Sequence, residues 1–109
     1  MSIITEKTSN AFKEGKNFKL SNSRIENRGM FTCFYLFDNL IARLDRSNWQ
    51  LKLWDCGRQT QTTKDRLNWI LSVLNCWYIK QEHYVWYYIT RKWIQNRRTG
   101  FQEIDVNFN

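Results

Sequence analysis

The sequence predicts an α+β fold in which a mainly antiparallel β-sheet, a meander plus a C-terminal hairpin, carries one central α-helix on one face. Three observations predict it. Short segments rich in β-branched and aromatic residues alternate with polar turns over residues 17–54 and again after residue 76. One stretch between them repeats its leucines with helical spacing. The 109 residues contain no proline and only four glycines, so nothing marks a linker between two domains.

Residues 1–16 are polar, lack a periodic pattern and carry Lys7, Lys13 and Lys16. We expect them to form a flexible basic arm, followed by a single α+β domain over residues 17–109. The segment has no apolar core of the kind that a secretory signal peptide needs, and no apolar run approaches the length of a membrane span. We therefore expect a cytoplasmic protein that does not use a membrane as a partner.

A meander is predicted for the strands that follow. Residues 17–26 alternate weakly and are predicted to be the first strand, with a turn at residues 27–29. Residues 30–37 are aromatic and form the second strand. Asp38-Asn39 is predicted as a two-residue hairpin turn, because Asn and Asp tolerate left-handed backbone angles. The chain then returns along residues 40–44.

Another turn is predicted at residues 45–48, and the next strand at residues 49–54. In this strand every second side chain is apolar: Trp49, Leu51 and Leu53. Gln50 and Lys52 lie between them. Such alternation is typical of a strand with one face on a core and the other in water.

The central helix is predicted from an apolar stripe with i, i+3, i+4, i+7 spacing, formed by Leu67, Ile70, Leu71 and Leu74. Thr62 is predicted to be its N-cap, with Asp65 three residues later in a capping-box arrangement. Asn75 is predicted to end the helix.

After the helix, residues 76–81 and 84–90 predict a second hairpin across Glu82-His83. Residues 96–100 predict a basic turn, and residues 101–108 a final edge strand. An edge strand together with exposed aromatic residues allows a dimer, but nothing in the sequence requires one.

The net charge of +7 and the isoelectric point of about 9.6 favour polyanionic partners: nucleic acid, acidic protein surfaces or anionic membranes. Residues 31–56 balance their charges, so the positive excess lies in the N-terminal arm and in residues 57–100. A protein that mimics nucleic acid should be acidic, so the composition excludes that class.

Two clusters of candidate contact residues follow from this charge. Arg58, Lys64 and Arg66 surround the predicted helix N-terminus, where free backbone N–H groups and the helix dipole favour phosphate. Simple helix capping is the competing interpretation. The second cluster combines aromatic and basic residues: Trp86, Arg91, Lys92, Trp93, Arg97 and Arg98. These side chains can stack on bases or anchor a protein interface, and packing in the core is the alternative for the aromatic ones.

Catalytic and metal-binding patterns are not evident. His83 is the only histidine, and it is predicted to lie at a hairpin tip. Cys33, Cys56 and Cys76 could join it in a Cys3His metal set, but the chain has no Cys-x-x-Cys pair. We therefore expect free structural cysteines, with Cys56 the most exposed, and neither an enzyme nor a bound metal or cofactor.

Four segments occur in an order that resembles a family of small uncharacterised proteins from phages, plasmids and cellular genomes: NFKLSNSRIE, YLFDNLIARLD, LWDCGRQTQTTKDRLNWIL and YIKQEHYVWYY. In that family a Cys-Gly or Gly-Trp loop precedes the pattern T-x-TTK-x-R-L/I-N. Residues 62–68, TTKDRLN, match its most specific part, while Arg58 stands where such proteins often have Trp. The resemblance implies no established activity. It implies a mobile-element setting, in which small proteins without catalytic residues often inhibit host machinery, as anti-CRISPR proteins do.

Together these observations predict a non-enzymatic binding protein of a phage or mobile element, acting in the host cytoplasm. It would occlude a nucleoprotein complex, such as a CRISPR effector, or the nucleic-acid site of that complex. The alternative is a sequence-independent accessory protein that binds DNA or RNA. A third hypothesis is a small ribonuclease toxin, which would use His83.

Overall fold

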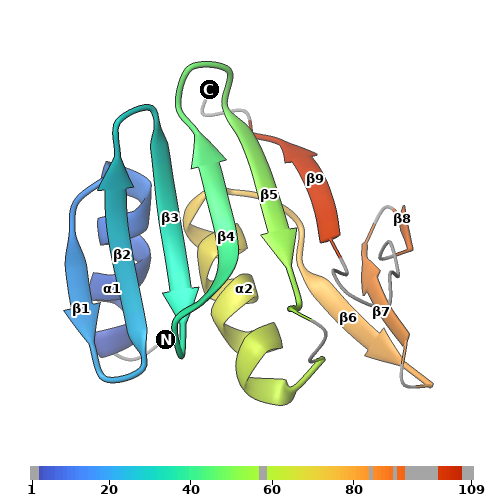
Figure 1. Cartoon of the computed structure of the whole chain (residues 1–109). Helices are drawn as coiled ribbons and strands as arrows, with labels where there is room; N and C mark the ends of the chain where they lie inside the picture. The colour runs from blue at the N-terminus through green and yellow to red at the C-terminus, as the bar shows by residue number, and fades with distance from the viewer. Residues whose placement is uncertain (1–2, 57–58, 84, 90, 93–100, 107–109) are drawn as a thin grey trace.

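The computed structural model describes residues 3–56, 59–83, 85–89, 91–92 and 101–106. Within these residues, a six-stranded antiparallel sheet with strand order β1-β2-β3-β4-β5-β9, called the large sheet below, lies beside a three-stranded sheet, β6-β7-β8, called the small sheet (Figure 1). The elements are α1 (Ile3–Glu14), β1 (Phe18–Leu20), β2 (Ser23–Arg28), β3 (Phe31–Leu36), β4 (Asn39–Asp45), β5 (Gln50–Trp54), α2 (Gln61–Val73), β6 (Ile79–Glu82), β7 (Val85–Tyr88), β8 (Arg91–Lys92) and β9 (Phe101–Asp105).

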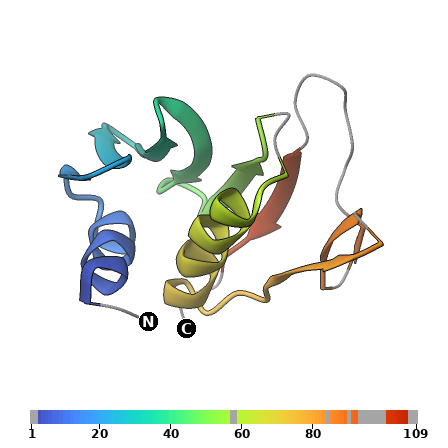
Figure 2. The same ribbon diagram turned by 90° about the horizontal axis from the view of Figure 1, so that it is seen from below.

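The predicted α+β class is confirmed, with an additional helix. Both helices lie on one face of the large sheet, where α1 packs on β1 to β3 and α2 on β4, and the helices also contact each other (Figures 1 and 2). The core fills the space between these layers. It includes Ile41, Ala42 and Leu44 of β4 and Leu51 and Leu53 of β5. It also includes the whole predicted stripe of α2: Leu67, Ile70, Leu71 and Leu74.

Helix α1 replaces most of the predicted flexible arm, so that prediction is wrong for residues 3–14. Phe12 is fully buried, and its ring centre lies 6.3 Å from that of Phe34 in β3. The helix ends at Gly15, whose φ of +72° suits a residue without a side chain. The backbone N–H of Gly15 donates to the Phe12 carbonyl and that of Lys16 to the Ala11 carbonyl, which satisfies the last carbonyls of the helix.

Turn positions in the first half differ from the prediction in two places. Residues 17–26 form two strands instead of one, because Ser21 takes a φ of +55° and the chain reverses at Ser21-Asn22. The β3–β4 turn lies at Phe37-Asp38, one residue earlier than predicted. Their φ angles of +50° and +64° are both positive, as a type I′ hairpin turn requires.

The later elements follow the prediction more closely. Leu51 and Leu53 of β5 are buried, as predicted, whereas Trp49 lies in the turn before β5 and is exposed, so its predicted place on the buried face is wrong. The last strand, β9, lies at an edge of the large sheet, as predicted, where it pairs with β5. In the second hairpin Glu82 pairs with Val85, so Glu82 belongs to β6 and not to the turn. Asn68 of α2 both donates to and accepts from the backbone of Ile79, which fixes β6 against the helix. The predicted turn at residues 96–100 lies outside the described residues.

The ends of α2 are well defined by hydrogen bonds. Thr60, not Thr62, is the N-cap: its hydroxyl accepts from the Thr63 N–H at 3.2 Å. Asp65 lies one turn further on and accepts from the Gln61 side chain at 2.7 Å, so it takes no part in the cap. At the other end, the backbone N–H groups of Asn75 and Cys76 donate to carbonyls of the last turn, which confirms Asn75 as the terminator.

The two threonines offer a matched test of this cap. We expect Thr60→Ala to lower the free energy of unfolding by about 1 kcal/mol, because the Thr63 N–H loses its acceptor. Thr62→Ala should change it by only a few tenths, since Thr62 is exposed within the helix. Urea unfolding followed by circular dichroism measures both values. A larger loss for Thr62→Ala would place the cap where the sequence pattern alone had put it.

Candidate nucleic-acid interface

One face of the large sheet turns away from both helices, and no described element lies over it (Figures 1 and 2). We call it the outer face. Side chains alternate along the strands except at the irregularity in β4, next to Ile41. Residues in register with the buried Ile25, Phe34 and Leu51 therefore point to the helices, and the residues beside them in each strand point outward. The outward residues with described side chains include Lys19, Arg24, Glu26, Arg28, Phe31, Cys33, Tyr35, Leu40, Arg43, Asp45, Gln50, Lys52, Trp54 and Glu103.

Arginines on this face lie against aromatic rings of neighbouring strands. The Arg24 guanidinium is 4.5 Å from the centre of the Tyr35 ring, its direct cross-strand partner. Arg43 lies 4.7 Å from the Phe31 ring and 5.7 Å from the Trp54 ring. Both rings are diagonal neighbours of Arg43, which a long side chain can reach. The face therefore presents half-buried rings and guanidinium groups side by side across β2 to β5.

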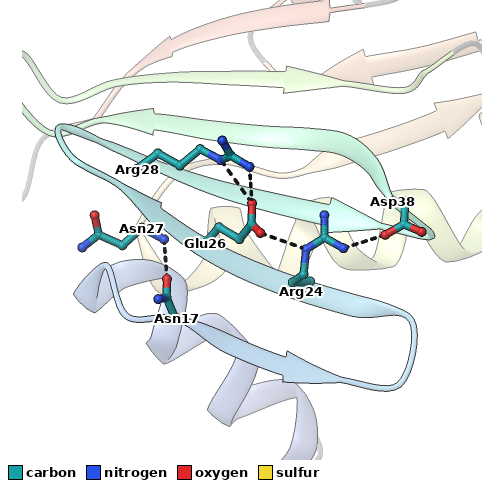
Figure 3. Close-up of polar contacts among 6 residues, drawn as sticks. All are labelled: Asn17, Arg24, Glu26, Asn27, Arg28 and Asp38. Atoms are coloured by element: carbon teal, nitrogen blue, oxygen red, sulfur yellow. Dashed lines mark hydrogen bonds and ion pairs between the residues drawn. The ribbon is translucent and has the colours of Figure 1, made fainter.

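A chain of ion pairs runs along the β2 side of the outer face (Figure 3). Arg24 Nη1 lies 2.6 Å from Asp38 Oδ1, and Arg24 Nε 3.4 Å from Glu26 Oε1. Arg28 Nη2 lies 2.8 Å from the other Glu26 oxygen, and this hydrogen bond and the Glu26 charge raise the pKa of Arg28. Ion pairs that are this exposed to solvent contribute little to the stability of the fold, but they orient the guanidinium groups of Arg24 and Arg28.

The described side chains of the outer face keep a small positive excess after this pairing. Together with Asp38, which pairs with Arg24, they include five cations against four carboxylates. Lys52 pairs with Glu103 at 3.1 Å, and Asp45 accepts from Ser47, which lowers the pKa of Asp45. Among the ion pairs of the described residues, none includes Arg43. Arg43 can therefore meet an external anion without giving up a carboxylate partner.

The first predicted cluster is only partly assembled. Lys64 Nζ lies 3.4 Å from the Gln81 side-chain oxygen, and so points toward the small sheet. The Arg66 guanidinium lies 4.0 Å from the Trp69 ring centre one turn along α2, and burial lowers the pKa of Arg66. Arg58 lies outside the described residues. The role of these three residues in binding stays a prediction.

The second predicted cluster loses one member. Trp86 is fully buried in the core, so its proposed role as an exposed contact residue is wrong. The reason is strand alternation: Trp86 and Tyr88 face inward on β7, and Val85 and Tyr87 are the more exposed pair. Arg91 and Lys92 form β8, but their side chains are not described. Trp93, Arg97 and Arg98 lie outside the described residues.

The cysteines and the histidine were the candidates that the sequence offered for catalysis or metal binding. Burial raises the pKa of Cys33, Cys56 and Cys76, which disfavours the reactive thiolate form. Cys56 is half-buried, and its thiol donates to the Leu40 carbonyl at 3.0 Å. His83 is exposed at the β6–β7 turn. In the described part of the chain, no three His, Cys, Asp or Glu side chains come together as metal ligands, and no helix has the length and apolarity to span a membrane.

The family assignment rests on a match over nearly the whole chain. Residues 1–106 match the family model described as Kyanoviridae Gp96 protein. The chain belongs to this phage family. The mobile-element setting that the resemblance implied is therefore correct at the level of a phage protein. No curated protein and no solved structure matches the chain significantly.

The sequence interpretation missed the outer face itself. Phe31, Tyr35, Arg43 and Trp54 lie in residues 31–56, where the charges balance, so no excess drew attention to them. An indication was present in the alternation of each strand, since Arg43 and Trp54 fall on the polar side of their patterns. Whether these four residues come together depends on the register between the strands, which cannot be read from the sequence.

Proposed function

We propose that this phage protein is a non-enzymatic binding protein whose outer face binds single-stranded nucleic acid. The observation that supports it is the set of arginine–aromatic pairs on an uncovered sheet face, Arg24 with Tyr35 and Arg43 with Phe31 and Trp54. Rings and guanidinium planes stack on bases, and the cations attract the phosphates between them.

A single strand fits this surface better than a duplex. Stacking on a protein ring requires a base face that is not already stacked in a helix, and single strands can splay their bases outward. The carboxylates of Glu26 and Asp38 lie among the arginines, so the evenly spaced phosphates of a rigid duplex meet repulsion there. A flexible single strand can lay its bases on the rings and place individual phosphates beside cations such as Arg43 and Lys19.

Binding of this kind gives a phage protein a simple way to act on its host. A protein that covers a single strand exposed in a host nucleoprotein complex occludes that complex. We propose this occlusion as the role in the host cytoplasm, with a CRISPR effector as one possible target, and the phage family supports the setting. A sequence-independent accessory role in handling phage DNA or RNA uses the same face.

Binding to bare oligonucleotides tests the proposal directly. We expect labelled single-stranded RNA or DNA of about 10 nucleotides, within the span that one small domain covers, to bind in a fluorescence anisotropy titration. The logarithm of the affinity should fall linearly with the logarithm of salt concentration as counterions are released. The duplex of the same sequence should bind more weakly. No binding at low salt, or tighter binding of the duplex, would contradict the proposal.

A pull-down from host lysate separates the possible routes to occlusion. Partners that disappear after nuclease treatment are held through nucleic acid, and partners that remain are held through protein contacts. The ribonuclease hypothesis is tested in the same preparations by the integrity of the RNA. Cleavage that is lost in His83→Ala would support that hypothesis against the binding role.

A further inference from the structure

Two turns at the same end of the large sheet enclose a hollow of about 480 Å³. The β1–β2 and β3–β4 turns lie next to each other at the lower edge of the sheet in Figure 1. Their backbones are joined where the Phe37 N–H donates to the Asn22 carbonyl at 2.9 Å, and their side chains where Arg24 meets Asp38. We call this the turn hollow. It is lined by Lys19, Ser21, Asn22, Ser23, Arg24, Phe37 and Asp38.

Phe37 occupies an unfavourable position in this hollow. Its φ of +50° is a left-handed backbone angle that Asn or Gly adopts far more readily than a bulky aromatic residue. Its side chain is 65% exposed, so burial in the core does not offset the strain. Strained residues that serve no packing role concentrate at binding sites. The exposed ring therefore requires an explanation outside the folding of the chain.

The turn hollow continues the outer face. Lys19 is the cross-strand neighbour of Arg24, and Arg24 that of Tyr35, so the three side chains form one row across β1 to β3. Arg24 stands at the junction, in contact with the Tyr35 ring on one side and lining the hollow on the other. A single-stranded nucleic acid that lies on the outer face along this row of side chains therefore reaches the turn hollow directly.

We propose that the turn hollow binds one nucleotide of the single strand, with its base stacked on Phe37 and its phosphate between Lys19 and Arg24. The inference rests on the proposed function and names a specific subsite within it. Lys19 and Arg24 are the cations that line the hollow, and Asp38 is its carboxylate. Asp38 is paired with Arg24, and none of the ion pairs among the described residues includes Lys19, so one positive charge is left to meet a phosphate. Ser21 and Asn22 add neutral hydrogen-bonding groups that can meet a base edge or a sugar hydroxyl.

Phe37→Asn tests this subsite with two readouts that move in opposite directions. We expect the affinity for a single-stranded oligonucleotide of about 10 nucleotides to fall about ten-fold, the effect of losing one stacked base. The urea midpoint should rise at the same time, because Asn suits the left-handed angle. Phe37→Tyr should retain the affinity. Met30→Ala is the matched control, an exposed apolar residue in the turn between β2 and β3 at the other end of the sheet.

Lys19→Ala adds a readout of the phosphate contact. The slope of the logarithm of affinity against the logarithm of salt should become shallower by about 0.7, the value for one phosphate of a single strand. An unchanged slope would overturn the assignment of the phosphate to Lys19.

The outcomes distinguish the subsite from the proposed function. If Phe37→Asn binds as tightly as the native protein while outer-face variants bind weakly, the subsite is wrong and the proposed function stands. If the native protein binds no oligonucleotide, both fail. If nuclease-treated lysate yields a protein partner that Phe37→Asn no longer captures, the turn hollow is a protein contact and the nucleotide assignment is overturned.

Discussion

Replacing Phe12 by alanine should lower the free energy of unfolding by about 3–5 kcal/mol, a large fraction of the stability of a domain this small. Phe12 is fully buried beneath the large sheet and packs beside Phe34. Truncation removes apolar contacts and leaves a cavity between α1 and β3 that the surrounding backbone cannot close completely. Urea unfolding followed by tryptophan fluorescence measures the loss.

The neighbouring residue supplies the control. Lys13 is exposed on the same helix, so Lys13→Ala should change the free energy of unfolding by less than about 0.5 kcal/mol. Equal small effects for both variants would mean that α1 does not pack on the sheet. The flexible arm expected from composition would then be the better description of the N-terminus.

The reason that α1 was not predicted lies in its buried face. The buried residues of α1 and its C-terminal end include Thr8, Ser9 and Gly15 along with Ala11 and Phe12. A search of the sequence for large apolar side chains finds only Ile3, Ile4 and Phe12 in this segment, too few to predict a helix. Small polar residues can nevertheless be buried where a helix approaches a sheet closely. The glycine that ends the helix was visible in the sequence, but with so few large apolar residues before it, it was not recognised as a C-cap.

Where a strong period exists, the sequence predicted the structure well. In α2 the leucine stripe fixed which side meets the sheet, and in β5 strict alternation buried Leu51 and Leu53. In these two elements the errors are confined to the ends, where the cap of α2 and the first residue of β5 lie one or two residues from their predicted places. Thr60 and Thr62 offer the same hydroxyl to a helix N-terminus, so residue type alone could not choose between them.

The β3–β4 turn illustrates the limit of turn preferences. Asp38-Asn39 carries the residues that such turns favour, yet the chain reverses at Phe37-Asp38. A shift of one residue would turn the side chains of one strand to the other face, which register with the core does not allow. The core thus decides where the chain turns, but it does not require an aromatic side chain at the strained and exposed position of Phe37.

The candidate site was the least predictable part. Arg58, Lys64 and Arg66 are close in the sequence and were easily grouped, although Lys64 and Arg66 contact different neighbours in the fold. Arg43 and Trp54 are eleven positions apart and meet only because β4 and β5 pair in one register. Sequence proximity finds clusters on helices and loops, whereas a surface across a sheet depends on pairings that are long-range.

The double variant Arg43→Ala with Trp54→Ala should weaken the binding of a single-stranded oligonucleotide by about 10- to 100-fold, the loss of at least one stacking platform and one phosphate contact. Arg43 holds its guanidinium near two rings, so removing it together with Trp54 clears the centre of the outer face. Anisotropy titrations at two salt concentrations measure the affinity and its salt slope. Urea midpoints show whether the variants remain folded.

Helix α2 carries a pair of the same chemistry in the opposite layer of the molecule. Arg66→Ala with Trp69→Ala removes the same charge and the same kind of ring, also from a cation–π pair, but from the helical side of the sheet (Figure 2). If binding were general attraction to a basic protein, the two double variants would lose affinity equally. If the helix cluster were the site, the α2 variant would lose more. The two double variants have the same net charge and differ in the layer of the molecule that is changed. A loss of affinity confined to the Arg43 and Trp54 variant therefore places the bound nucleic acid on the outer face.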